Sequence, residues 1–586
     1  MDDNDSFLYH RYEDAILKIE YYLAKNNNFS RLDNNLYNGL NAWKTEYTNV
    51  EKTWEIHIIF PKYYPDDLPE IRINNFSNLF LKNPHIDEDG YLCIVPNSAS
   101  YDSDDIISIF NYLIDSTKSI LDGTKKSDFQ DEFESYWNRN ISPRQECCVL
   151  ISSPEDLEKR YHVFIGEKII CISINKNNLF SWLNNFCSMD INNFVERECF
   201  VLRIDMPLSP DEYPDSIYDV LIIVKKYDLG VYKDLVEFII HSGNYCFILL
   251  VQKNKNRYSL GGILLSGLLL CNKQKYSNGF RIGCVPSNIL ISRATHQLKG
   301  TLIDRFKINR ADHNWIHSRG GDGKIFNNKN IVLLGCGSLG GYLAHYLAKT
   351  GVGNIIIIDK ENLKFSNIGR HILGSDSVEK YKSVALEQKL KKEMPHLNIK
   401  GIGSDWREIY EKDDNIFRTA DLLISTMAEW KSEKPLNLLT RAMDFPPVVY
   451  AWLEPFAVAG HCFISIPESG CIECQMDKKG IFNKRVALFE NNILERETGT
   501  CTYYQEYGPS ALMPIISMII SEIISQLSNP LKESKLSTWI SDEKHLSSVN
   551  ARITEEWKNK TNISGFSKIY YNIVEPNKSC KVCTRI

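Results

Sequence analysis

The chain has 586 residues, of which 43% are hydrophobic and 24% charged, a composition typical of a globular protein with two to four domains. Its formal net charge of −6 gives no reason to expect a nucleic-acid partner. We find no run of about 18 apolar residues and therefore expect no membrane span. Sixteen cysteines without a secretion signal predict a cytoplasmic protein with reduced, catalytic or metal-binding thiols.

The first 145 residues have the pattern of a small α+β domain. Residues 10–25 have helical apolar spacing, and residues 43–47 and 52–60 alternate like antiparallel strands. The segment TWEIHIIFPKYYPDDLPEIRI continues with three spaced prolines and another strand, and NPHIDEDGYLCIVP follows ten residues later.

These two pieces resemble a ubiquitin-conjugating enzyme, in which a YPxxxP turn ends the strand meander and an HPN tripeptide precedes the catalytic cysteine. The resemblance implies that Cys93 is a thioester-forming nucleophile. Asn83-Pro84-His85 stands at the HPN tripeptide, so His85, with Asn83 two residues away, would stabilise the oxyanion. The alternatives are a buried structural thiol and a conjugating-type module that only binds.

The middle of the chain, residues 146–310, is predicted to be an α/β linker or scaffold domain. The strand-like runs are residues 161–174, 200–204, 220–224 and 245–251, and the helical stretches are residues 179–186 and 232–241. Its cysteines form no C-x-x-C pair. The segment LGGILLSG lacks the strand–helix context of a phosphate loop, so we interpret it as close packing.

Residues 329–383 have the pattern of a nucleotide-binding βαβ unit. An apolar strand at 331–334 enters the glycine turn GCGSLG, a helix follows, and a second strand at 354–358 ends on Asp359, 24 residues after the first glycine. A glycine turn, a helix N-terminus and a ribose-binding carboxylate form the dinucleotide fingerprint. Alone, this pattern suggests NAD and a dehydrogenase.

Three polar residues downstream, Asn367, Arg370 and Lys382, suit a triphosphate attacked at its α-phosphate better than a hydride-transfer site. The whole run resembles the doubly wound, Rossmann-like adenylation domain of ubiquitin-activating enzymes and their sulfur-carrier relatives of the ThiF, MoeB and HesA type. The resemblance implies that ATP lies on the glycine turn, that Asp359 holds its ribose, and that these three residues contact phosphates, with Arg370 also catalytic. The turn residues concerned are Gly335, Gly337, Ser338 and Gly340.

Mg²⁺ is the second expected cofactor, because adenylation releases pyrophosphate. Relatives place a Mg²⁺-binding aspartate after a later strand, which here corresponds to residues 421–425. This chain has Ala428 at that position, with Glu429 beside it.

Two C-x-x-C pairs, Cys471/Cys474 and Cys580/Cys583, predict a structural Zn²⁺ site, since two such turns complete a tetrahedral set of four thiolates. A redox pair is the alternative. Between them, residues 497–508 are polar and loop-like, and residues 512–527 form an apolar helix of the core. Cys501 stands where thioester-forming relatives carry the catalytic thiol of their crossover loop.

The order of domains resembles the E2–E1 fusion proteins of bacterial antiphage (CBASS) systems. It implies an E2-like domain at 1–145, a linker domain at 146–310 and an E1-like domain at 311–586. The resemblance further implies a homodimer that activates a protein C-terminus, that of a cyclic-nucleotide-synthesising (CD-NTase-type) enzyme, and joins it to a lysine of an acceptor protein. Two rivals are a sulfur-carrier adenylyltransferase with a non-catalytic N-terminal module, and a scaffold that merely binds nucleotide and a protein tail.

Overall fold

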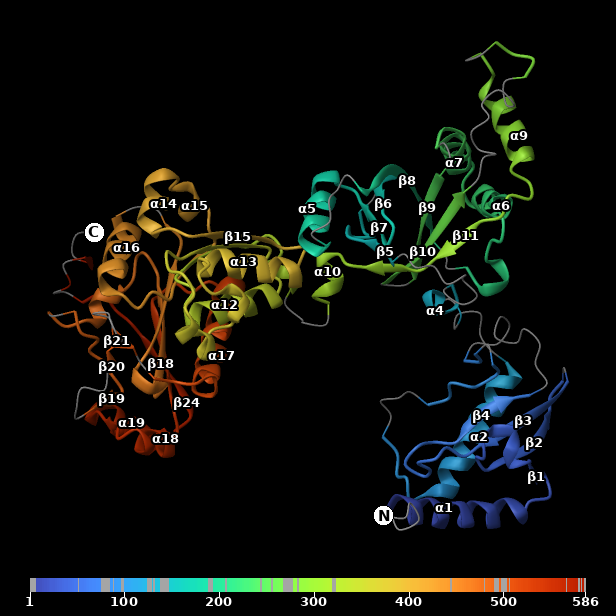
Figure 1. The fold of residues 1–586 in the computed structure, drawn as a ribbon, viewed down its shortest axis with the longest axis horizontal. Helices are drawn as coiled ribbons and strands as arrows, with labels where there is room; N and C mark the ends of the chain where they lie inside the picture. Colours follow the sequence, from blue (N-terminus) through green and yellow to red (C-terminus); the bar gives the residue numbers. More distant parts are fainter. Residues whose placement is uncertain are drawn as a thin grey trace. The chain divides into compact units, whose positions relative to one another are not determined.

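A computed structural model of the chain gives the fold (Figure 1). It describes residues 7–583 except 51, 75–84, 88, 96–99, 124–128, 130–131, 138–146, 157, 188–192, 206–207, 243–244, 255–256, 267–277, 282–283, 319–322, 443–444, 479, 490–494, 497–502, 505, 565, 578–579 and 581.

The chain forms two compact units. The first comprises Met1–Cys148, Leu157–Val163 and Arg197–Ile308, and the second comprises Val149–Asp156, Phe164–Glu196 and Asn309–Ile586.

The N-terminal part of the first unit is an antiparallel sheet with two long helices. The strands follow chain order: β1 (Phe29–Arg31), β2 (Ala42–Thr48), β3 (Thr53–Ile59) and β4 (Glu70–Ile73). Helices α1 (Phe7–Ala24) and α2 (Ile106–Asp122) share one apolar core with this sheet (Figure 1). Ile16, Ile19 and Leu23 of α1 are buried because they recur at helical spacing. The side chain of Asp105 caps α2 by accepting from Ser108 N.

The remainder of the first unit is built around a sheet in which β11, β10, β9 and β8 are neighbours in that order. Their bounds, with those of the helices, are α4 (Phe133–Trp137), β8 (Val195–Ile204), α6 (Ile217–Tyr227), α7 (Leu229–His241), β9 (Tyr245–Asn254), β10 (Arg257–Ser266), α9 (Ser287–Gln297) and β11 (Asp304–Phe306). The predicted close packing of LGGILLSG agrees with its place in β10, where a Cβ at Gly261 would lie 2.7 Å from Trp137 Cε2.

The prediction of a strand at residues 220–224 is wrong. These residues belong to α6, whose first turn carries a capping box between Ser216 and Asp219. A short apolar run fits a buried strand and a buried helix equally well, and here the cap signal decides for the helix.

The second unit begins with short strands and one helix that precede the large C-terminal sheet. Strands β7 (Ile169–Ser173), β5 (Cys147–Leu150) and β12 (Ile308–Arg310) are neighbours. Strand β6 (Arg160–Ile165), most of which belongs to the first unit, precedes β7 in the chain. Helix α5 (Lys176–Cys187) buries Leu179 and Leu183 against β7, in a core with Phe164 and Cys171.

The C-terminal part of the second unit holds a doubly wound sheet. Five parallel strands, in the order β15 (Asn398–Ile402), β14 (Asn354–Ile358), β13 (Asn330–Leu334), β16 (Leu422–Ser425) and β17 (Val448–Leu453), continue into antiparallel β18 (Ala459–Ser465), β22 (Lys535–Ile540) and β24 (Lys568–Ile573). Strand order reverses between β13 and β16. In such sheets ligands bind at the carboxyl ends of the strands beside this reversal.

Helices cover both faces of this sheet, as Figure 1 shows. One face packs against α12 (Ser338–Lys349), α13 (Lys382–Glu393) and α17 (Pro509–Ser528), and the other against α14 (Trp406–Lys412), α15 (Asn415–Arg418) and α16 (Trp430–Ala442). The smaller elements are α10 (His313–Ile316), α11 (Gly323–Phe326), α18 (Glu543–Ser548), α19 (Glu555–Ser564), β19 (Ala487–Leu488), β20 (Glu495–Arg496), β21 (Tyr503–Tyr504) and β23 (Arg552–Ile553).

Helix α17 is the one described helix that is long and apolar enough, by length and composition, to cross a membrane. Half of its most apolar window is buried, and Leu512, Ile515 and Ile519 belong to the core that α17 shares with α12 and β18. The predicted core helix is therefore present.

Candidate active sites

The glycine turn lies at the carboxyl end of β13 and has the shape of a phosphate loop. Gly335 has φ +84°, a conformation that suits glycine. A Cβ on Gly340 would fall on the carbonyl oxygen of Gly335 and the hydroxyl of Thr426, so only glycine fits there. A Cβ on Gly337, at the N-cap of α12, would meet nothing within 4 Å. The turn is thus tightly packed toward the protein and open at the start of the helix.

Asp359, at the end of β14, is joined to this turn by hydrogen bonds. Its Oδ2 accepts from Cys336 N at 2.7 Å, and its Oδ1 accepts from Glu361 N at 2.8 Å. Each carboxylate oxygen keeps a second lone pair, so the side chain can still accept from a ribose hydroxyl.

Lys382 begins α13 and is largely buried, with its Nζ 2.5 Å from Glu361 Oε2. Glu361 was not anticipated from the sequence. It supplies the counter-charge that a buried lysine needs. A triphosphate arriving at Lys382 would compete with Glu361 for this cation.

Arg370 lies with its guanidinium carbon 5.1 Å from the centre of the Tyr507 ring, and the Tyr507 hydroxyl is 2.5 Å from Ser338 Oγ. Tyr507 therefore contacts both Arg370 and Ser338, two residues predicted to bind ATP. The sequence did not indicate a role for Tyr507. Asn367 accepts through Oδ1 from Lys364 N within the same short helical turn, Phe365–Arg370.

The segment after β16 holds the position for which the sequence resemblance predicts a Mg²⁺ ligand. Ala428 has φ +52°, and its N–H donates to the buried carboxyl of Glu433. Glu429 is held by Lys431 at 2.7 Å and by Ser432. Burial raises the pKa of Glu433 to about 7, although Ser425 also donates to it. Glu433 holds this loop by accepting from Ser425 and Ala428. The sequence did not indicate this role.

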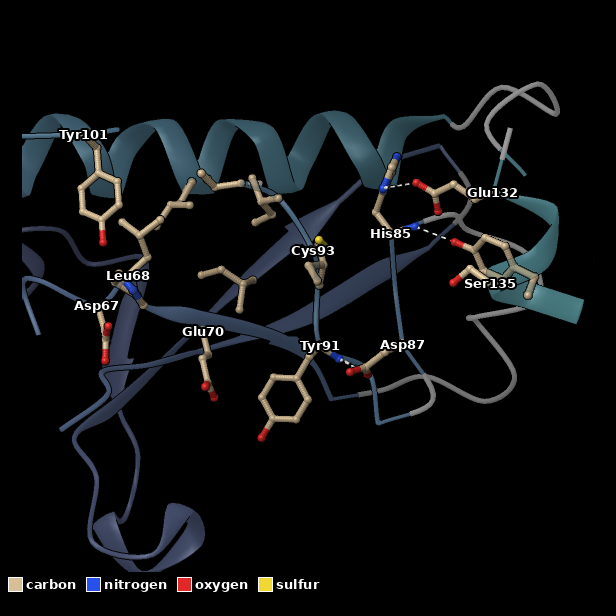
Figure 2. Close-up of a pocket in the computed structure, with 17 residues that line it drawn as sticks. Asp67, Leu68, Glu70, His85, Asp87, Tyr91, Cys93, Tyr101, Glu132 and Ser135 are labelled. Atoms are coloured by element: carbon tan, nitrogen blue, oxygen red, sulfur yellow. Dashed lines mark hydrogen bonds and ion pairs between the residues drawn. The ribbon is translucent and has the colours of Figure 1, made fainter. Parts of the chain in front are cut away.

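Cys93 is exposed and lines a cavity of about 960 Å³ in the N-terminal domain (Figure 2). The carbonyl of His85 accepts from Cys93 N at 2.8 Å, which fixes the two residues beside each other. Asn83 and Pro84, the other members of the tripeptide, lie outside the described residues. A thiol at the wall of an open cavity is accessible to a protein tail and to an incoming amine.

His85 is supported by residues that follow α2 in the chain. Its φ is +68°, its N–H donates to the Tyr136 hydroxyl at 2.9 Å, and its Nδ1 lies 3.8 Å from Glu132 Oε1. Figure 2 shows the imidazole turned toward Glu132. Nothing in the spacing of the active-site segment indicated Glu132 or Tyr136, which come about fifty residues later.

The four predicted zinc ligands meet in the second unit. Neighbouring sulfurs lie 3.4 to 3.8 Å apart, and all four fall within 4.8 Å of one another. Zn–S bonds of about 2.3 Å in a tetrahedron place sulfurs about 3.8 Å apart. The set Cys471, Cys474, Cys580 and Cys583 is therefore compatible with zinc.

Cys501, the predicted thioester nucleophile of the activating domain, lies outside the described residues. Two other cysteines of the same region, Cys336 and Cys462, are buried, and burial raises the pKa of each thiol above its ordinary value. A thiol that stays protonated is a weak nucleophile.

Two protein-family models match separate parts of the chain. Residues 316–562 match the ThiF family, and residues 24–144 match prokaryotic E2 family B. The ATP-dependent ubiquitin transferase-like protein Cap2 of Escherichia coli is 24% identical over 486 residues, which cover 74% of this chain and 78% of that protein. Cap2 of Vibrio cholerae is 23% identical, and the match covers 71% of this chain and 75% of that protein. The crystal structure of E. coli MccB with ATP is 17% identical with a TM-score of 0.31, covering 55% of this chain and 77% of MccB.

The matches to the two families and to the Cap2 proteins, together with the glycine turn on a doubly wound sheet and the exposed cysteine, define the class: the chain is an E1/E2-like adenylating transferase. It is an E2–E1 fusion: residues 24–144 match prokaryotic E2 family B and residues 316–562 match the ThiF family.

Proposed function

We propose that the protein activates the C-terminal carboxylate of a partner protein with ATP and conjugates it, through two successive thioesters, to an amine. The observation that carries the proposal is the presence in one chain of an open glycine turn with Lys382 and of an exposed, cavity-lining Cys93. The glycine turn and Lys382 serve the activation of the carboxylate, and Cys93 serves its transfer to the amine.

The reaction begins when a carboxylate oxygen attacks the α-phosphorus of ATP, the bond to the β-phosphate breaks, and pyrophosphate leaves. The Cys501 thiolate then attacks the acyl carbon and releases AMP. Cys93 displaces Cys501 by thioester exchange, and an amine, that of an acceptor lysine, displaces Cys93 and loses its proton as the amide forms. Splitting one acylation into several transfers is the advantage of covalent catalysis.

Residues of the chain have separate tasks in this scheme. Lys382 and Arg370 stabilise negative charge on the phosphates, and Asp359 accepts from the ribose. His85 and its support at Glu132 and Tyr136 hold the segment around Cys93 in shape for the oxyanion that forms during aminolysis. Mg²⁺ bound with ATP would supply the positive charge that neutralises the leaving pyrophosphate.

Zn²⁺ bound by the four cysteines has a structural role in the proposal. Cys580 and Cys583 lie near the end of the chain, and the ion would hold this segment against the turn at Cys471. A site of four thiolates leaves no coordination position for chemistry.

The proposed setting is cytoplasmic antiphage defence of the CBASS type, with a homodimer acting on a CD-NTase-type cyclic nucleotide synthase. It is supported by the likeness to the two Cap2 proteins over about three quarters of the chain.

The first half of the proposal is tested by ATP–pyrophosphate exchange in the presence of candidate tail proteins. Lys382→Met should abolish exchange, because it removes the buried cation and keeps the aliphatic stem. Lys389→Met is the matched control, since Lys389 lies on the same helix and pairs with Glu393 on the surface. Exchange that survives Lys382→Met refutes the assignment of this site, and absence of exchange with every tail favours a nucleotide-binding scaffold.

The second half separates the fusion enzyme from a sulfur-carrier adenylyltransferase. If the N-terminal domain is catalytic, Cys93→Ala blocks formation of the amide while ATP–pyrophosphate exchange continues. If the domain only binds, Cys93→Ala leaves the products unchanged.

A further inference from the structure

Three histidines meet in the second unit, away from the residues assigned to nucleotide and to the four-cysteine site. His313 and His317 are four residues apart on the turn of α10, so their side chains share one face. His396 comes from the loop between α13 and β15. Ring nitrogens of all three lie within 4.8 Å of one another.

The geometry of the cluster resembles a coordination sphere. Nε2 of His317 lies 2.9 Å from Nε2 of His396, and the ring centroids are 4.5, 5.4 and 5.1 Å apart. Zn–N bonds of about 2.0 to 2.1 Å in a tetrahedron place ligand nitrogens about 3.3 Å apart. The spacing between His317 and His396 is close to this value, and a ring nitrogen of His313 lies within 4.8 Å of both.

A hydrogen bond between two imidazoles does not account for the cluster. One ring can donate to the other through Nε2, but Nδ1 of His396 is buried without a hydrogen-bond partner. The hydrogen bond also joins only two of the three rings, so it leaves the close approach of the third ring unexplained. The third ring, His313, is also within reach.

The surroundings enclose and orient these rings. His317 is buried, and His313 and His396 are partly buried. The backbone carbonyl of Lys349, at the end of α12, hydrogen-bonds to His317. Metal-binding histidines commonly use their second nitrogen in this way.

The ligand set selects the kind of ion. Among the described residues, the group that could bind this ion consists of three imidazoles and includes no carboxylate. Glu393, the last residue of α13, lies 3.4 Å from His345 Nδ1 and 2.8 Å from Lys389 Nζ. Neutral nitrogen ligands suit Zn²⁺, Co²⁺, Ni²⁺ and Cu²⁺, whereas Mg²⁺ and Ca²⁺ require oxygen ligands.

We propose that His313, His317 and His396 bind one divalent transition-metal ion, with Zn²⁺ the natural occupant and water in the remaining position. The site is distinct from the four-cysteine site and does not depend on the proposed function. The ion would join α10, the entry into the adenylation fold, to the loop after α13.

That loop is a structural junction. Helix α5 packs against α13, and Asn185 Nδ2 donates to the carbonyl of Pro395, the residue before His396. Lys382 lies at the first turn of the same α13. The role of the ion is therefore to stabilise the junction of α10, α13 and α5.

The test is metal stoichiometry of the full chain after stripping and reconstitution with Co²⁺, measured by elemental analysis and by absorption. We expect the His396→Gln variant to lose one equivalent relative to wild type and to keep the thiolate-to-cobalt charge-transfer bands of the four-cysteine site. Cys580→Ser should show the reverse. His545→Gln, in which a histidine outside the cluster is changed, should bind as wild type.

A second variant guards against failure of His396→Gln to fold. His313 is partly exposed, so His313→Gln should be tolerated and should lose the same equivalent of Co²⁺. The proposal is overturned if both folded histidine variants bind as much Co²⁺ as wild type, or if every equivalent bound by wild type disappears in Cys580→Ser.

Discussion

Two alanine substitutions in the glycine turn distinguish packing from ligand binding. Gly340→Ala places a methyl group against the Gly335 carbonyl and the Thr426 hydroxyl. The backbone at Gly335 must move to relieve this contact. Gly337→Ala places the same methyl group in open space at the N-cap of α12. The first change is therefore expected to damage the fold, and the second only the binding of a ligand.

The magnitudes follow from these two environments. Overpacking in a rigid site costs roughly 1–3 kcal/mol, and Gly340→Ala belongs at the upper end because its neighbours are backbone atoms. Gly337 has φ −66°, which any residue adopts, so Gly337→Ala should change stability by less than about 0.5 kcal/mol. If phosphate oxygens approach the helix N-terminus there, the added methyl should weaken ATP binding at least about tenfold, which corresponds to about 1.4 kcal/mol.

Isothermal titration with ATP and thermal melting of the full chain measure the two quantities separately. We expect Gly337→Ala to melt as wild type and to bind ATP more weakly, and Gly340→Ala to melt at a clearly lower temperature. Wild-type affinity in a folded Gly337→Ala variant would falsify the placement of the triphosphate at this helix N-terminus.

Three further predictions concern buried partners. The pKa of Glu433 is raised to about 7, so between about pH 4.3 and 7 this carboxyl ionises only in the unfolded chain, and the protein should lose about 3 kcal/mol of stability over that range. Glu433→Gln should reduce the dependence of the melting temperature on pH. The same pH dependence in wild type and variant would contradict this prediction. Tyr136→Phe removes the acceptor of His85 N–H, so it should lower stability by about 1 kcal/mol and slow the discharge of the thioester on Cys93. Tyr101→Phe, in the wall of the same cavity, is the control. Equal discharge rates in the two variants would contradict the support of His85 by Tyr136. Cys580→Ser should release zinc and lower the melting temperature, whereas unchanged zinc content would exclude the four-cysteine site.

Local signals explain what could be predicted from the sequence. The glycine turn, the strand before it and the carboxylate after β14 are adjacent in the chain, and their spacing alone identifies a nucleotide fold. The four cysteines could be recognised as one set because each C-x-x-C pair is itself a local pattern.

The sequence was insufficient where contacts join distant residues or where a short run is ambiguous. Residues 220–224 are helical, and their apolar run alone cannot show it. Tyr507 meets Ser338 across 169 positions, and His396 meets His317 across 79, so neither contact leaves a periodic signal. The three-domain division and the role of Cys501 stay predictions.

The relay of thioesters is tested most directly by a non-reducing gel of the protein with ATP, Mg²⁺ and candidate tail proteins. Wild type, Cys501→Ala and Cys93→Ala are compared, each with and without a thiol reductant. We expect a reductant-sensitive adduct that is absent in Cys501→Ala and retained on Cys501 in Cys93→Ala. A tail that supports ATP turnover to AMP while no variant and no wild-type protein forms an adduct would contradict it.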